Sequence, residues 1–196
     1  AILSAPNTQL SEADNVLVQG VECSPYAIGY FGFAYYVENE GKLNALSIDG
    51  VAPTAETAES NEYPLSRPLF VYSDAKIMQE KPQVAAFINY FLTYVNEEIE
   101  DVGYFPASQA ALDQARQSWL DASSAQPAAG VMLPAVDPAS LSGNIVLAGS
   151  STVFPLAERM AERFKEEGFT EDKGKITIDS IGSRGGFERY CKTGET

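Results

Sequence analysis

Three consecutive hydroxyl side chains follow a short apolar run in the last third of the chain. Residues 145–148 are Ile-Val-Leu-Ala, which is typical of a strand, and they lead through Gly149 into Ser150, Ser151 and Thr152. Pro155 then marks the beginning of a helical pattern. The first turn of a helix has backbone N–H groups without a partner inside the helix and the positive end of the helix dipole. This order of strand, polar turn and helix predicts a site that binds an oxyanion through amides and hydroxyls.

The same pattern occurs again further along the chain. Residues 176–181 favour a strand, residues 182–187 are Gly-Ser-Arg-Gly-Gly-Phe, and a helical pattern begins at Glu188. Two parallel strands joined by a helix end at the same edge of a sheet, where open α/β sheets bind ligands. We therefore expect the two turns to form one anion-binding site. The alternative is that glycine and serine only allow tight turns between strand and helix.

Composition limits the classes of function that the chain can have. Its 196 residues are 45% hydrophobic, enough for one main core. The net charge of −14 argues against nucleic acid or an anionic membrane as a partner. Histidine is absent, which excludes Ser-His-Asp, Cys-His and histidine–zinc chemistry. We expect a protein that is not an enzyme and that has no metal or cofactor.

The cysteines, the longest apolar runs and the first residues bear on disulfide formation, membrane insertion and export. Cys23 and Cys191 have no metal-binding spacing, and the sequence leaves open whether they form a disulfide or are free thiols. No apolar run approaches the roughly eighteen residues that a membrane-spanning helix requires. The first residues lack a basic segment, so we expect no intact signal peptide in this chain.

The first part of the chain predicts mixed secondary structure. Residues 14–20 fit either a helix or a strand, and residues rich in β-favouring side chains predict strands over 27–36, 43–48 and 63–72. The first of these strands is expected to pass into a short helix that ends near Gly41, and another short helix is expected over 56–60. The aromatic residues of 30–36 favour core packing over a stacking platform for a sugar or base.

The middle of the chain predicts helices and then a linker. Apolar residues from Val84 to Val95 recur at spacings of three and four, which indicates an amphipathic helix. A second helix is expected over 108–121, with Ser108 as its N-cap. Residues 121–142 are rich in Pro, Ser, Ala and Gly, and are interpreted as a linker.

These motifs resemble a known family, but in reversed order. Residues 148–155, residues 179–187 and the pair Glu195-Thr196 are similar to the amino-terminal part of the phosphate-binding proteins that serve ABC-type phosphate importers. Residues 27–36, residues 63–70 and the helices around Phe87 and Trp119 resemble that family's carboxyl-terminal part. The resemblance implies an α/β fold, a single lobe of a type II periplasmic-binding-protein fold, with a mainly parallel sheet and helices on both faces.

The resemblance also implies a domain organisation. Residues 1–120 correspond to the carboxyl-terminal part, 121–142 to a linker and 143–196 to the amino-terminal part, and the family's middle lobe is missing. Three arrangements fit this order: a circularly permuted single lobe, the junction of two tandem copies, and segment exchange between neighbouring chains. We favour the closed lobe, because the linker is long enough for the two halves to fold on each other.

The site residues follow from the matching motifs. The first loop would bind phosphate through amides and hydroxyls of Ser151, Thr152, Val153 and Phe154. The second loop would do so through Ser183 and the amides near Gly185, with Arg184 expected to point outward. The family's buried Asp and Arg lie in the missing segments, so the resemblance implies half a site, weak affinity and no hinge closure.

The resemblance implies inorganic phosphate or a similar oxyanion as the ligand, the membrane subunits of an ABC importer as partners and an extracytoplasmic location. The alternative function is a structural or assembly module that keeps the fold and associates by segment exchange or through the aromatic face of residues 30–36. An esterase or phosphatase is a third possibility, and the absence of histidine makes us expect no turnover.

Overall fold

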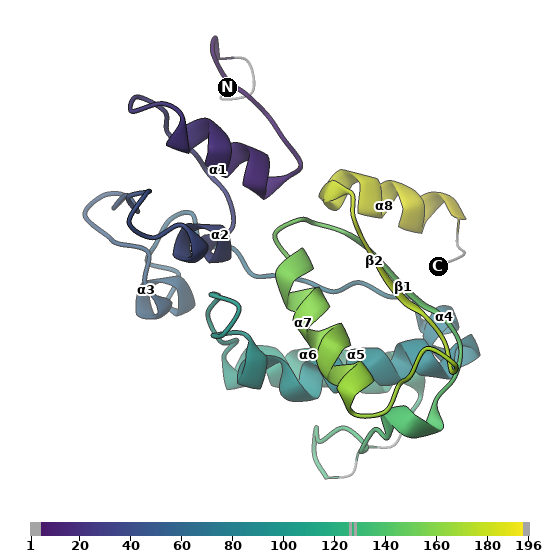
Figure 1. Ribbon diagram of the computed structural model, residues 1–196. Coiled ribbons are helices and arrows are strands. Elements are labelled where there is room, and N and C mark those ends of the chain that lie inside the picture. The colour runs from purple at the N-terminus through teal and green to yellow at the C-terminus, as the bar shows by residue number, and fades with distance from the viewer. Residues whose placement is uncertain (1–4, 126, 128, 194–196) are drawn as a thin grey trace.

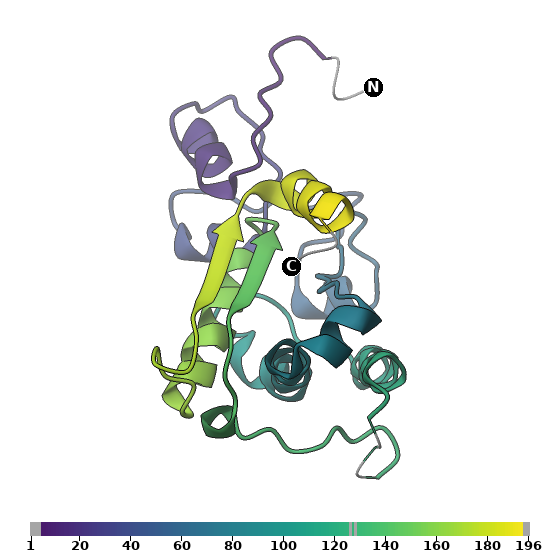
Figure 2. The same cartoon turned by 90° about the vertical axis from the view of Figure 1, so that its right-hand side faces the viewer.

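Two parallel strands lie at the centre of the carboxyl-terminal half (Figures 1 and 2). The computed structural model describes residues 5–125, 127 and 129–193. The elements of this half are β1 (Ile145–Gly149), α7 (Phe154–Glu166), β2 (Ile176–Ser180) and α8 (Gly182–Thr193). Ile145 pairs with Ile176, and Gly149 pairs with Ser180. The predicted α/β class with a parallel sheet is confirmed, and α8 begins before Glu188, where its start was expected.

The remaining elements are mostly helices. In chain order they are α1 (Asp14–Glu22), α2 (Phe33–Glu38), α3 (Ala55–Glu59), α4 (Ala75–Glu80), α5 (Pro82–Glu98), α6 (Gln109–Ser123) and the 3-10 helix η2 (Pro138–Ser140). The ambiguous residues 14–20 are helical. Ser108 caps α6 as predicted, since its hydroxyl accepts a hydrogen bond from the amide of Ala111.

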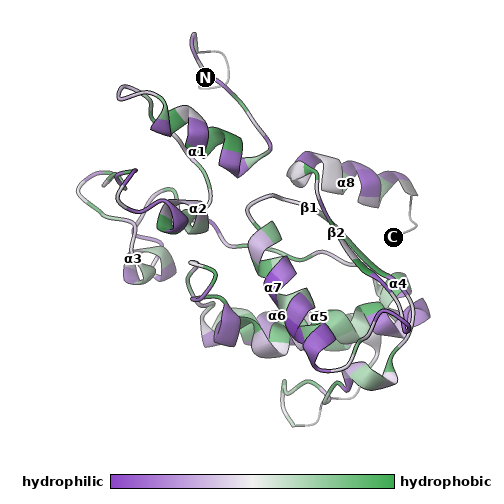
Figure 3. Cartoon of the chain, viewed as in Figure 1, coloured by the Kyte–Doolittle hydropathy of each residue, from purple (hydrophilic) through white to green (hydrophobic). Residues whose placement is uncertain are grey.

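The main core lies between α5, α7 and the sheet. It contains Phe87 and Tyr90 of α5, Met160 and Phe164 of α7, and Ile145 of β1. In Figure 3, α7 alternates between hydrophilic and hydrophobic residues, as expected of a helix with one buried face. Burial of this face therefore holds the helix that follows the first polar turn against the core.

A second, smaller cluster connects α5, α6 and the linker. Trp119 donates an indole hydrogen bond to the carbonyl of Ala85, and Leu133 of the linker is buried beside it. Asn89 of α5 donates to the carbonyl of Pro134. The described part of residues 121–142 thus lies on the surface of the helices and is anchored there.

The three strands predicted in the first part are wrong. Residues 27–32, 44–47 and 63–72 belong to no strand, and several of their apolar side chains are exposed, among them Ile28 at 84% and Phe70 at 61%. A β-favouring sequence is stable as a strand only when a neighbouring strand pairs with it. Within the described residues, these stretches have no such neighbour.

Two further features concern the chain as a whole. Cys23 and Cys191 are both free and exposed. No helix in the described ranges is long and apolar enough to cross a membrane. Glu195 and Thr196, which contributed to the family resemblance, lie outside the described residues.

Candidate functional site

The two polar turns lie side by side at the carboxyl edge of the sheet. Gly149 and Ser180 are paired across the strands, and the amide of Ile181 donates to the carbonyl of Gly149 over 3.1 Å. Gly186 of α8 packs against the end of β1, where an added Cβ would lie 2.8 Å from the carbonyl oxygen of Ala148. The first loop is residues 150–153. The second loop is defined as Ile181 with the first turn of α8, residues 182–185. Both therefore open at the same edge.

The hydroxyls of the first loop are bound to a carboxylate from the other end of the chain. Ser151 Oγ lies 2.5 Å from Asp14 Oδ2 and 2.7 Å from the carbonyl oxygen of Glu12, and Thr152 Oγ1 donates to the same Oδ2 over 3.0 Å. The amide of Gly32 donates to Asp14 Oδ1 over 2.9 Å. Asp14 is 6% exposed and Ser151 8% exposed. A buried internal anion therefore accepts the hydrogen bonds that the sequence predicts for an external one.

The amides of the first loop are bonded within the loop itself. Thr152 N donates to Ser150 Oγ over 3.2 Å, while Val153 N and Phe154 N donate to the Ser150 carbonyl over 3.2 and 3.1 Å. In this conformation the predicted donors at Thr152, Val153 and Phe154 are in use. An oxyanion would have to displace these bonds or share them.

Two tyrosines support the first loop from the core side. Tyr35 donates to the carbonyl of Ser151 over 2.8 Å, and Tyr104 donates to the carbonyl of Thr152 over 2.7 Å. Burial, with a further contribution from Asp14, raises the pKa of Tyr35 to about 12. Burial, followed by the effect of Tyr35, also raises the pKa of Tyr104. Both phenols therefore stay protonated as donors near neutral pH.

The second loop is more exposed to solvent than the first loop. Ser183 is exposed, and its hydroxyl has no hydrogen-bond partner within the part of the chain that the structure describes. Arg184 is 83% exposed and pairs with Glu188 over 3.1 Å. Gly182 has φ of 77°, and a Cβ there would lie 2.3 Å from Glu12 Oε2. The Glu12 carboxylate thus lies against the first residue of α8.

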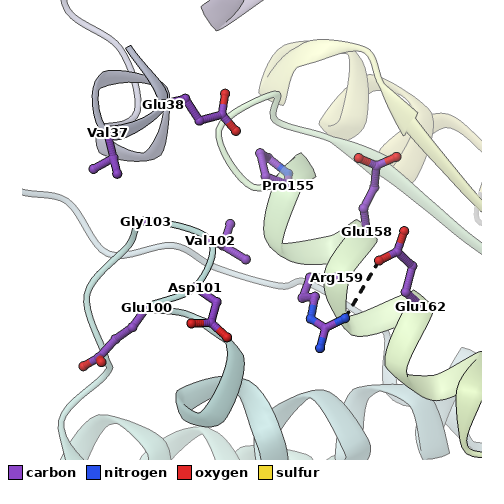
Figure 4. Close-up of a pocket in the computed structure, with 10 residues that line it drawn as sticks. All are labelled: Val37, Glu38, Glu100, Asp101, Val102, Gly103, Pro155, Glu158, Arg159 and Glu162. Carbon is purple, nitrogen blue, oxygen red and sulfur yellow. Dashed lines mark ion pairs between the residues drawn. The ribbon is translucent and has the colours of Figure 1, made fainter. Parts of the chain in front are cut away.

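A cavity of about 300 Å³ lies beside α7 but does not suit an anion (Figure 4). Its acidic lining consists of Glu38, Glu100, Asp101, Glu158 and Glu162, and Arg159 is its one basic residue. Arg159 also pairs with Glu98 over 2.6 Å. Coulomb repulsion from the carboxylates disfavours phosphate there. Among the described residues, no acidic or cysteine cluster could hold a metal ion.

The sequence predicted the two loops but not the acids that contact them. Glu12 and Asp14 are separated from the loops by most of the chain, and only folding brings these parts together. Asp14 also lies at the start of α1, where an acidic residue is expected simply to favour the helix dipole. Local sequence therefore gave no sign of its role at the first loop.

Comparison with known proteins assigns the fold. Residues 4–94 match the PBP superfamily domain. The structure also matches the crystal structure of the phosphate-binding protein of a phosphate ABC transporter from Streptococcus pneumoniae, with a TM-score of 0.59 and 23% identity, over 97% of this chain and 62% of that one. The predicted α/β fold of the periplasmic-binding-protein type is confirmed.

Curated relatives match part of the chain at a higher sequence identity than the S. pneumoniae structure does. Protein SphX of Synechocystis sp. is 40% identical over 118 residues, which are 58% of this chain and 35% of SphX. The phosphate-binding protein PstS of Staphylococcus aureus is 36% identical over 100 residues, which are 48% of this chain and 31% of PstS. The chain spans about a third of the length of these relatives. PstS is named as a binding protein, in agreement with the prediction that the chain is not an enzyme.

Proposed function

We propose that this chain binds phosphate, or a similar oxyanion, at the edge formed by the first and second loops. The observation that supports this most directly is the parallel pairing of β1 and β2, in which Gly149 lies opposite Ser180. It follows that both polar turns and the first residues of α7 and α8 lie at one edge of the sheet. The proposed ligands are the hydroxyls and amides of Ser151, Thr152, Val153, Phe154, Ser183 and Gly185.

The proposed site is half of the one that the family resemblance implies. In this proposal residues 1–120 and 143–196 form one lobe joined by the linker 121–142, with the family order reversed and the middle lobe absent. An extracytoplasmic location and the membrane subunits of an ABC importer as partners belong to the same proposal. We expect weak affinity, because the proposed half-site lacks the groups that the resemblance places in the middle lobe.

Calorimetric titration of the purified chain with inorganic phosphate tests this function. We expect saturable binding in the high micromolar range or weaker, reduced by Ser183→Ala, which removes an exposed donor. Ser47→Ala, which removes an exposed serine hydroxyl outside both loops, is the matched control and should not reduce binding. Absence of saturable heat at millimolar phosphate would contradict the proposal.

Assembly through the irregular first part is a second candidate function. It is favoured by large apolar side chains that remain exposed there, notably Tyr26 at 93% and Ile28 at 84%. Exposed apolar groups of this size are typical of surfaces that contact another protein. Light scattering across a concentration series distinguishes assembly from phosphate binding by a monomer. Assembly requires a molecular mass above that of the monomer, and this mass should persist when the sample is diluted.

A further inference from the structure

We infer that residues 12–14, here called the acidic strap, act as a built-in competitor that sets how tightly the two loops bind an external anion. The inference rests on the proposed function and concerns the same site. Its starting point is that the strap's two carboxylates lie one at each loop: Asp14 at the first and Glu12 at the second. The strap thus lies where an oxyanion bound by both loops would have to lie.

At the first loop, Asp14 has the contacts of a bound anion. Its carboxylate accepts from two hydroxyls, Ser151 and Thr152, and from the amide of Gly32. Hydrogen bonds to a charged acceptor are stronger than those to a neutral one, so these contacts hold the carboxylate in place. A phosphate oxygen needs the same hydroxyl protons. The two anions therefore exclude each other at the first loop.

At the second loop, Glu12 acts by position and charge. Its Oε2 lies so close to Gly182 that a methyl group on that residue would overlap it at 2.3 Å. Its backbone carbonyl oxygen lies 2.7 Å from Ser151 Oγ and shares the single hydroxyl proton with Asp14, which places the strap between the loops. A negative charge beside the first turn of α8 is favoured by the helix dipole, and it offsets the attraction that this turn would exert on phosphate.

The strap is attached in a way that permits displacement. Residues 5–10, which precede it, are exposed and outside any helix or strand. Glu12 itself is exposed, and its side-chain carboxylate accepts no hydrogen bond within the described residues. Asp14 is the first residue of α1, so its side chain can leave the loop without unwinding the helix. Removing the charges of the strap should therefore strengthen phosphate binding and preserve the fold.

Calorimetric titration of phosphate into Asp14→Asn and Glu12→Gln variants tests the inference. Asparagine keeps an acceptor oxygen for Ser151 and Thr152, loses the acceptor for the Gly32 amide and removes the charge. We expect the Kd to fall at least tenfold relative to the unmodified chain. Glu12→Gln changes an exposed charge, so a decrease of about two- to fivefold is expected. Asp49→Asn is the matched control: Asp49 is exposed, its φ of 52° suits asparagine, and no change in Kd is expected.

The possible results test the competitor role of the strap separately from the proposed phosphate binding. If the unmodified chain binds phosphate and both variants bind as the Asp49→Asn control does, the strap is not a competitor and the proposed function stands. Weaker binding by Asp14→Asn would also overturn the inference, because Asp14 would then be part of the phosphate site. If no variant binds, the proposed function and the inference are both wrong. Circular dichroism shows whether each variant is folded. If Asp14→Asn does not fold, the phosphate affinity of Glu12→Gln alone tests whether the strap is a competitor.

Discussion

The first and second loops begin from almost the same sequence pattern and end in opposite environments. Each follows a parallel strand with a small polar turn and leads into a helix. The first loop is enclosed by Asp14, Gly32, Tyr35 and Tyr104, all from the other half of the chain. The second loop exposes Ser183 to solvent. The local pattern thus determines the turn, while distant residues determine whether its donors are available.

Close packing explains how the distant residues reach the first loop. Gly32 has no side chain at the point where Thr152 and Tyr104 approach it, and a Cβ there would lie 2.7 Å from Thr152 Cγ2 and 2.7 Å from Tyr104 Oη. Its amide is then free to donate to Asp14. If the two loops differ in this way, substitutions around the first should affect stability and substitutions in the second should affect mainly binding.

Gly32→Ala should give the largest effect on stability. Its backbone, with φ of −61° and ψ of 139°, suits alanine, so the cost is the steric overlap alone. Overpacking of this kind costs about 2 kcal/mol. The measurement is the free energy of unfolding in urea. Gly20→Ala is the matched control, because a Cβ there has only Gln9 within reach, at 3.9 Å, and alanine favours the helix. If Gly32→Ala and Gly20→Ala had the same free energy of unfolding, close packing around the first loop would not contribute to stability.

Tyr104→Phe should have the next largest effect and should change the response to alkaline pH. Loss of the phenol leaves the Thr152 carbonyl without that donor, at a cost of about 1.5 kcal/mol. Because the folded-state pKa values of Tyr104 and Tyr35 are raised, the fold favours their protonated forms. The stability they contribute is complete below the ordinary tyrosine pKa and is lost as pH rises toward about 12.

Urea unfolding at a series of alkaline pH values measures this loss. The unmodified chain should lose stability steeply above the ordinary tyrosine range, while a Tyr35→Phe/Tyr104→Phe variant should lose less. Tyr26→Phe is the control, since Tyr26 is 93% exposed. Equal alkaline slopes for all of these proteins would mean that the tyrosines do not support the first loop.

Gly182→Ala should cost about 1 kcal/mol, because alanine is strained at a φ of 77°. Glu12 Cβ would also lie 2.7 Å from the new methyl group, so relieving the overlap requires the strap to shift as well as the carboxylate to move away. The exposed chain before the strap permits such a shift, so the overlap itself adds little. Gly50→Ala is a suitable comparison, since Gly50 also has positive φ, of 82°, with nothing within 4 Å. Similar losses in urea would show that backbone strain dominates at the second loop. A much larger loss at Gly182 would show that Glu12 is held there firmly.

The sequence predicted the carboxyl-terminal half well, because its signals are local. Residues 145–149 and 176–180 are strands joined by a helix, and the parallel pairing follows from this helical crossover between them. The amphipathic period of α5 depends only on the buried face of one helix. Such features are determined by neighbouring residues and can be predicted from them.

The remaining features depend on contacts between distant residues. The stretch 63–72 has a strand-like sequence, but a strand also needs a partner, and no described segment pairs with it. Asp14 begins a stretch that fits either a helix or a strand by its sequence, and in the folded chain it lies at the first loop. In both cases the residue types were visible in the sequence, while the partner that decides the outcome was not.

Ser183→Ala should have the smallest effect on stability and the clearest effect on binding at the second loop. Its hydroxyl is exposed and has no partner within the described residues, so the free energy of unfolding should change by less than about 0.5 kcal/mol. Phosphate affinity should fall by about three- to tenfold, as for the loss of one hydrogen bond to a charged ligand in contact with water. Ser151→Ala should lower the stability more than Ser183→Ala does, because the Ser151 hydroxyl is buried and bonded to Asp14. If both serines changed stability equally, burial by the distant half of the chain would not be what distinguishes the loops.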